Sequence, residues 1–196
     1  MDLALASSAD SLSADEFFAK MNEAVPGIFD KLDGWASHSY PNPDFSSPPD
    51  KLGRTGIDGY KWELAEIKKY TSKDLPVFIT ETGWKRGEIL NEEEISQYYD
   101  QAFKTVWKDT KIIAVAPFVL GYPESLFHQF SFKSNDKNYY KYFVTIRDIM
   151  KTKGDPGRKN IASDVTVRGP ANILMNESKD IIVKFRNNGN FIWNFK

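Results

Sequence analysis

The stretch Pro76–Trp84, PVFITETGW, decides how the chain is organised. Its residues from Val77 to Thr80 predict a buried β-strand, and that strand leads directly into the carboxylate of Glu81. Side chains alternate between the two faces of a strand, so Val77, Ile79 and Glu81 are expected to share one face. In βα architectures, functional side chains lie at the carboxyl ends of the strands. The stretch therefore predicts that Glu81 projects from a strand end into a site.

Helices and strands alternate on both sides of this stretch. Capping signals mark two helix starts: Ser13 followed by Glu16, and Asn91 followed by three acidic residues. Apolar runs and helical spacing predict strands at 32–39, 76–80 and 112–120, and helices beginning at 13 and 91 and covering 59–70 and 138–150. Such alternation predicts an α/β fold with a parallel sheet covered by helices.

The character of the chain changes after residue 152. Residues 153–162 are polar, contain glycine and proline, and predict a linker between residues 1–152 and a second module at 163–196. Within that module, residues 165–167 and 181–185 predict strands. Two or three strands are fewer than a β-sandwich needs, so the module is expected to be incomplete.

Composition excludes several classes of protein. The 196 residues carry 26 Lys and Arg against 27 Asp and Glu, a net charge of -1 that predicts neither nucleic acid nor an anionic membrane as a partner. No apolar run approaches the ~20 residues of a membrane span, and the first twenty residues do not resemble a signal peptide. Cysteine is absent and there are two histidines, so no metal site and no cofactor are expected.

The first strand is expected to deliver two polar side chains to the same site. His38 and Tyr40 share one face of the segment 32–39, and Trp35 lies on the other. We expect the Trp35 face to pack on helices and the His38 and Tyr40 face to point toward the mouth of a barrel.

The segments that follow the other two strands supply aromatic residues. Phe118 and Tyr122 come at the end of the strand 112–120 and are expected to form an apolar wall beside the site, and Trp84 follows Glu81. Val77 and Ile79 are expected to fill interior layers of the barrel below Glu81.

Three segments together resemble the sixth, seventh and eighth strands of clan A glycoside hydrolases, which are (β/α)8-barrel enzymes that include cellulase-like and family thirty-nine-like glycosidases. The segments are DGWASHSYPN at 33–42, LPVFITETGW at 75–84 and IIAVAPFVLGYP at 112–123. The resemblance covers about residues 1–152. It implies that Glu81 is the catalytic nucleophile and that His38 and Tyr40 line the catalytic subsite.

The resemblance implies a retaining mechanism on a polysaccharide or oligosaccharide outside the cell or at its surface. Glu81 would attack the anomeric carbon while a second carboxylic acid, ~5–5.5 Å away, protonates the leaving oxygen. Tyr40 would hydrogen-bond Glu81, and His38 would bind a sugar hydroxyl or hold Tyr40. Trp84, Phe118 and Tyr122 would contact sugar rings, although many clan members have tryptophan where Phe118 stands.

The second carboxylic acid is the largest departure from the clan. It belongs to the end of the fourth strand, and this chain offers three strands and a trace of the fifth at 3–6, whereas a full barrel needs about 250 residues. The pair Asn22–Glu23 lies within a predicted helix and does not match. The chain therefore predicts the C-terminal half of a barrel, which is inactive alone and associates through its open flank. The segment 183–194, VKFRNNGNFIWN, resembles part of an immunoglobulin-like accessory module.

Other interpretations of the same residues stay open. The chain could be a non-catalytic carbohydrate-binding or scaffold remnant of a barrel, or a βα enzyme in which Glu81 transfers protons without forming a covalent bond. Among single residues, His38 could be an ordinary buried histidine, Tyr40 could pack a loop, and Trp84 could cover the rim of the barrel.

Overall fold

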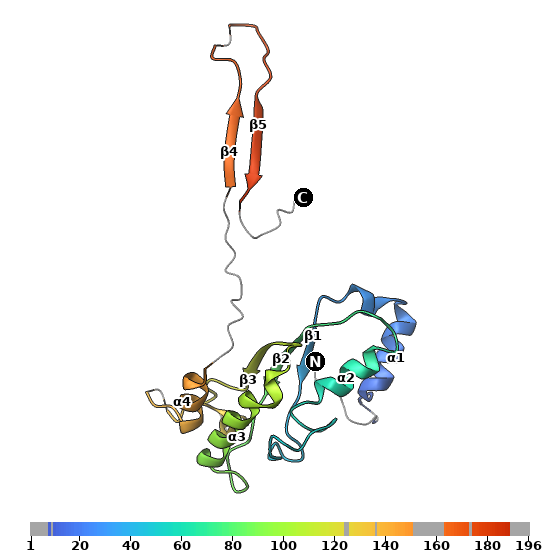
Figure 1. Ribbon diagram of the computed structural model, residues 1–196, viewed down its shortest axis with the longest axis vertical. Helices are drawn as coiled ribbons and strands as arrows, with labels where there is room; N and C mark the ends of the chain where they lie inside the picture. Colours follow the sequence, from blue (N-terminus) through green and yellow to red (C-terminus); the bar gives the residue numbers. More distant parts are fainter. Residues whose placement is uncertain are drawn as a thin grey trace. The chain divides into compact units, whose positions relative to one another are not determined.

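The computed structural model describes residue 8 and residues 10–123, 126–135, 137–150, 163–172 and 174–188. The chain divides into two compact units, Met1–Lys151 and Thr152–Lys196, each described by itself (Figure 1). The predicted linker at 153–162 and the predicted strand trace at 3–6 lie outside the described residues.

The first unit contains helices and strands in the predicted order. They are α1 (Ala14–Ala24), β1 (Trp35–His38), α2 (Tyr60–Ile67), β2 (Val77–Thr82), α3 (Glu92–Lys104), β3 (Ile112–Pro117) and α4 (Lys141–Asp148), with short 3-10 helices at Ile28–Lys31, Val106–Lys108 and His128–Phe130. The strands form one sheet in the order β1-β2-β3, and both pairs are parallel (Figure 1). The predicted parallel pairing is confirmed, whereas closure into a barrel stays a prediction.

The two predicted helix starts differ in their caps. Asn91 accepts hydrogen bonds from the backbone N–H groups of Glu93 and Glu94, and the Glu94 carboxylate accepts one from the backbone N–H of Asn91, which completes a capping box. Helix α1 starts after Ser13 as predicted. The Ser13 side chain, however, makes no capping hydrogen bond to the backbone of α1, because its hydroxyl is hydrogen-bonded to the carboxylate of Asp15.

The buried face of the sheet packs on the helices. Val77 and Ile79 of β2 are 0% and 1% exposed and belong to a core that includes residues of α2, α3 and α4. Trp35 of β1 lies on the same side, since its indole N–H donates to the carboxylate of Glu63 in α2 at 2.6 Å. The position expected for Trp35 is confirmed. The expected position of Val77 and Ile79 inside a barrel is wrong, because large aliphatic side chains on this face fill the layer between sheet and helices.

A β-bulge explains how Glu81 nevertheless reaches the other face. Ser37 is opposite Ile79 and His38 is opposite Glu81, so Thr80 is an extra residue in β2. One extra residue shifts the alternation of side chains by one step. Glu81 therefore lies beside His38 instead of following Ile79 toward the helices.

The second face of the sheet carries small and apolar side chains that are exposed. Among the described residues, Ala36, Phe78 and Ala114 lie opposite one another on this face, and all three are exposed. Phe78 is 37% exposed and Ile113 is 60% exposed. Parallel sheets are normally covered on both faces, so an exposed apolar face is unusual for this sheet. The predicted open flank is a strand edge instead of a face, and association through that edge stays a prediction.

In the part of the second unit that the structure describes, there is one antiparallel hairpin, formed by β4 (Ser163–Arg168) and β5 (Ile182–Asn187). Val165 is opposite Phe185 and Val167 is opposite Val183, so these four apolar side chains share one face, and all are exposed. An isolated two-stranded hairpin is marginally stable in water. The immunoglobulin-like module stays a prediction.

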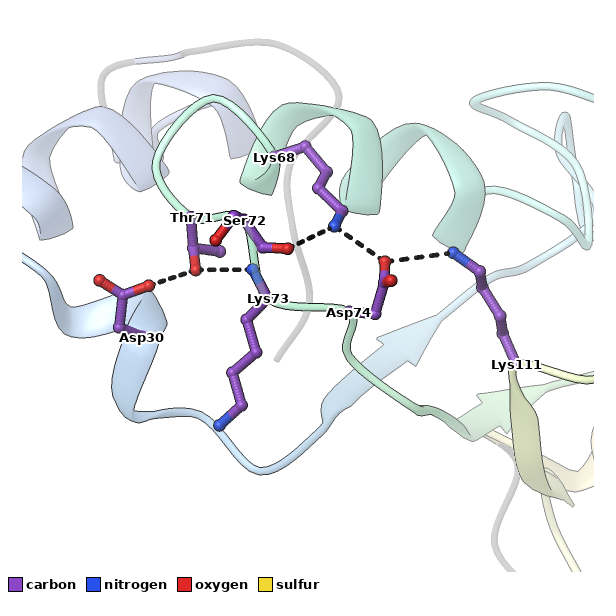
Figure 2. A network of polar contacts seen from close by, with 7 residues as sticks. All are labelled: Asp30, Lys68, Thr71, Ser72, Lys73, Asp74 and Lys111. Carbon is purple, nitrogen blue, oxygen red and sulfur yellow. Dashed lines mark hydrogen bonds and ion pairs between the residues drawn. The ribbon is translucent and has the colours of Figure 1, made fainter.

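A polar network ties elements together at the amino ends of the strands, away from Glu81 (Figure 2). The Asp74 carboxylate, which precedes β2, accepts a hydrogen bond from the Lys68 ammonium after α2 at 2.8 Å and lies 3.8 Å from the Lys111 ammonium before β3. The hydrogen bond from Lys68 is the largest cause that lowers the pKa of Asp74 below its usual 3.8. The network therefore favours the ionised carboxylate in the folded state.

We expect Asp74→Asn to lower the melting temperature by about 1–3 °C at pH 7, since exposed ion pairs contribute little. Because folding lowers the pKa of Asp74, its contribution is present above pH 3.8 and is lost as the pH falls through the folded-state value. Thermal unfolding followed by circular dichroism should show the difference at pH 7 and its decrease as the pH falls below 3.8. A difference that persists at low pH would contradict this role for the carboxylate.

Candidate functional site

The carboxyl ends of the three strands surround a cavity of about 520 Å³. Glu81 from the end of β2 and Phe118 from the end of β3 line it together with loop residues. The full lining is Tyr40, Phe45, Glu81, Lys85, Phe118, Leu126, Phe127, Gln129 and Phe130. Its volume lies within the range of small-ligand sites.

Glu81 is contacted by both predicted partners. The Tyr40 hydroxyl donates to Glu81 Oε2 at 3.2 Å, and His38 Nδ1 lies 3.5 Å from the same oxygen. The Glu81 side chain is 36% exposed and that of His38 is 15% exposed. Within the described residues, Glu81 Oε1 accepts no hydrogen bond. The carboxylate is therefore oriented through one oxygen, and the other is available to a ligand.

The turn after Glu81 requires glycine. Gly83 has a φ of 149°, and a Cβ at this position would lie 2.7 Å from the Tyr99 hydroxyl and 3.2 Å from the Phe118 carbonyl oxygen. Burial raises the pKa of Tyr99 well above its usual range, so this hydroxyl stays neutral. Because Gly83 has no side chain, it can pack closely on Tyr99 and on the Phe118 backbone, which brings the carboxyl ends of β2 and β3 together next to Glu81.

Tyr40 is positioned by an aromatic cluster that sequence analysis did not identify. The Phe45 ring lies 5.1 Å from the Tyr40 ring and 5.2 Å from the Phe130 ring, both in edge-on geometry. Phe45 has a φ of 56° and follows Asp44 with a φ of 55°, an unfavourable conformation for a bulky residue. The backbone N–H of Lys85 donates to the Phe45 carbonyl at 3.1 Å and holds this loop. The sequence around Phe45 does not predict its unusual backbone conformation or its contact with Tyr40. The spacing of Phe127 and Phe130, in contrast, does indicate that these two side chains pack in an apolar environment.

Phe118 occupies the position expected for a wall residue. It lines the cavity beside Glu81, and its ring lies 5.4 Å from that of Phe127 and 5.9 Å from that of Phe130. The peptide bond between Phe118 and Val119 is cis. One side of the cavity is therefore aromatic.

Trp84 does not fit its predicted role in sugar stacking. It is 2% exposed, its ring contacts those of Tyr98, Tyr99 and Trp107, and its indole N–H donates to the Ser47 carbonyl at 2.8 Å. Trp84 is therefore a core residue that supports the loop after β2.

Tyr122 lies outside the Glu81 cavity. It lines a separate cavity of about 370 Å³ together with His128, and its carbonyl oxygen lies 3.3 Å from His128 Nδ1. The Tyr122 ring is 5.3 Å from that of Phe127, which does line the Glu81 cavity. Its predicted contact with a sugar beside Glu81 is therefore corrected to indirect support of the wall through Phe127.

The described residues limit the chemistry that the site offers. Among them, no group of three His, Cys, Asp or Glu residues could hold a metal ion, and no helix has both the length and the apolar character to cross a membrane. Glu81 is the one carboxylate among the described residues that line its cavity. The arrangement can provide a nucleophile or a base, and a hydroxyl donor beside it.

Comparison of the chain with protein-family models, with curated proteins and with solved structures finds no match. The family of the chain therefore stays a prediction from its strand-end motifs.

Proposed function

We propose that the chain carries the nucleophile side of a retaining glycoside hydrolase site, with Glu81 as the nucleophile. The observation that supports the proposal most strongly is the surroundings of the Glu81 carboxylate at the end of a parallel strand. One of its oxygens accepts a hydrogen bond from the Tyr40 hydroxyl and lies near His38 Nδ1, and the carboxylate borders an aromatic cavity. A hydroxyl that donates to one oxygen of a carboxylate orients the other oxygen for attack.

In the proposed reaction, Glu81 Oε1 attacks the anomeric carbon of a sugar that packs against Phe118 and Phe130. The bond from the anomeric carbon to the leaving oxygen breaks, and that oxygen takes a proton from a second carboxylic acid. Water, deprotonated by that second group, then hydrolyses the glycosyl ester. Because Glu81 is the one carboxylate among the described residues that line this cavity, the second carboxylic acid is not one of these lining residues.

Covalent trapping tests the nucleophile without the second carboxylate. A 2-deoxy-2-fluoro glycoside with a dinitrophenolate leaving group needs no proton to depart, and the fluorine slows hydrolysis of the ester. We expect the gluco, xylo, manno or galacto form of this reagent to add one fluorosugar to the chain, measured by intact mass, and peptide mapping to place it on Glu81. Labelling at another carboxylate, or at none with all four sugars, would overturn the proposal.

A second candidate is a non-catalytic carbohydrate-binding protein. The observation that favours it is the single carboxylate in the described cavity, since retaining hydrolysis needs two. Saccharide binding at the cavity without labelling of Glu81 would support this candidate. Turnover of a glycoside without labelling would instead support proton transfer by Glu81 with no covalent step.

We expect Tyr40→Phe to slow labelling of Glu81 by about 10- to 1000-fold, the range for one hydrogen bond aimed at developing charge. The substitution removes only the hydroxyl that lies 3.2 Å from Glu81 Oε2 and leaves the ring packed on Phe45. Tyr122→Phe is the matched control, because Tyr122 lines a different cavity, and it should label at the unaltered rate. Equal rates for Tyr40→Phe and the unaltered chain would remove Tyr40 from the site.

A further inference from the structure

A second cavity adjoins the one beside Glu81. It has a volume of about 440 Å³ and is lined by Asp44, Lys85, Gly87, Glu88, Ile89 and Gln129. Two of these residues, Lys85 and Gln129, also line the Glu81 cavity. The two cavities therefore meet at the Lys85 and Gln129 side chains.

Backbone hydrogen bonds fix the boundary between the two cavities. The N–H of Lys85 donates to the Phe45 carbonyl at 3.1 Å, and the N–H of Arg86 donates to the Gln129 carbonyl at 3.0 Å. A third bond, from Gly87 N–H to the Leu90 carbonyl at 2.9 Å, closes the loop after β2 on itself. The loops that follow all three strands are thus joined at this boundary, which makes it a built feature of the fold.

The chemistry of the two cavities is complementary. The first has five aromatic side chains beside Glu81, whereas the described lining of the second has none. The second offers two carboxylates, one ammonium group and one carboxamide, which together can accept and donate hydrogen bonds to several hydroxyl groups. Asp44 and Glu88 outnumber Lys85, so the lining carries a formal charge of -1 and disfavours an anionic ligand.

We propose that the two cavities form one extended site for a neutral oligosaccharide. One sugar residue packs on the aromatic rings beside Glu81, and the next lies in the polar cavity with its hydroxyl groups bonded to Asp44, Lys85, Glu88 and Gln129. This inference rests on the proposed function and deepens it, because it assigns the substrate class as an uncharged chain of two or more sugars.

Titration of the full, ¹⁵N-labelled chain with saccharides tests the extended site by amide chemical shifts. The probes are glucose, xylose and mannose, their β-1,4-linked tetrasaccharides, and tetragalacturonate as an anionic chain. We expect one neutral tetrasaccharide to shift the amide signals of Tyr40 and Glu81 and also those of Gly87 and Glu88. The matching monosaccharide should shift only the first pair, and tetragalacturonate should bind at least about 3-fold more weakly.

A variant in the second cavity separates the two proposals. Glu88→Ala should weaken binding of the tetrasaccharide by about 3- to 10-fold, the net value of one hydrogen bond, and leave monosaccharide binding unaltered. Glu23→Ala, an exposed glutamate of α1, is the matched control and should change neither. Shifts at Tyr40 and Glu81 without shifts at Gly87 and Glu88, or an unchanged affinity in Glu88→Ala, would overturn the extended site alone. Absence of shifts at Tyr40 and Glu81 with every probe would overturn the proposed function as well.

Discussion

Glu81→Gln is expected to reduce fluorosugar labelling, and any turnover of activated glycosides, by at least about 1000-fold, which corresponds to ~4 kcal/mol at the transition state. An amide is a poor nucleophile, yet it has the shape of the carboxylate and its oxygen can still accept the Tyr40 hydroxyl bond at the end of β2. The loss should therefore come from the chemistry and leave the fold intact. The measurement is the rate of dinitrophenolate release, with circular dichroism as the check on folding.

Two further variants make this test specific to Glu81. Glu63→Gln replaces a buried carboxylate of α2 that accepts the Trp35 indole N–H, so it controls for removal of a carboxylate elsewhere in the unit and should label normally. Glu81→Ala opens space beside the anomeric carbon, and added azide should restore release of dinitrophenolate by attacking in place of the carboxylate. Normal labelling of Glu81→Gln, or equal loss in Glu63→Gln, would contradict the assignment of the nucleophile.

Trp84→Ala is expected to lower the free energy of unfolding by about 3–5 kcal/mol, the usual cost of removing a large buried aromatic side chain. The ring is 2% exposed and contacts Tyr98, Tyr99 and Trp107, and the substitution also leaves the Ser47 carbonyl without its indole donor. Urea unfolding followed by far-ultraviolet circular dichroism measures the change, which would be under about 1 kcal/mol if Trp84 were an exposed sugar platform.

Phe78→Ala is the matched aromatic control for Trp84. Phe78 lies in β2, the strand that Trp84 follows, but on the uncovered face of the sheet, and it is 37% exposed. Its replacement by alanine should therefore lower the free energy of unfolding by less than about 1.5 kcal/mol. If Phe78→Ala lowered the free energy of unfolding as much as Trp84→Ala, this face of the sheet would be covered in solution, by another segment of the chain or by another protein molecule. The pair of variants therefore also examines whether this face of the sheet is covered in solution.

The parallel pairing of the strands, and the sheet edge at which Glu81, His38 and Tyr40 lie, could be predicted from local pattern alone. Apolar runs mark β2 and β3, and the carboxyl ends of neighbouring parallel strands lie at one edge of a sheet. That rule brings Glu81, His38 and Tyr40 to one edge of the sheet, and the bulge at Thr80 then places Glu81 beside His38.

The remaining features depend on contacts between distant residues, which local pattern does not contain. Strict alternation along β2 predicts that Val77 and Ile79 share a face with Glu81. This prediction is wrong because of the bulge at Thr80, which has no sequence signature. Trp84 is buried by contacts with other aromatic side chains, and Phe45 is held in an unfavourable conformation by a hydrogen bond from another loop. Each of these is a tertiary effect that overrides a local expectation.

The extra residue at Thr80 has a consequence for how this strand can change over time. Without this extra residue, regular alternation along β2 would place Glu81 on the same face as Val77 and Ile79, which pack on the helices. With it, the lower part of β2 serves the interior while Glu81 is released to the opposite face. Mutations at Val77 and Ile79 can thus tune resistance to unfolding without moving the carboxylate, and the two properties can evolve separately.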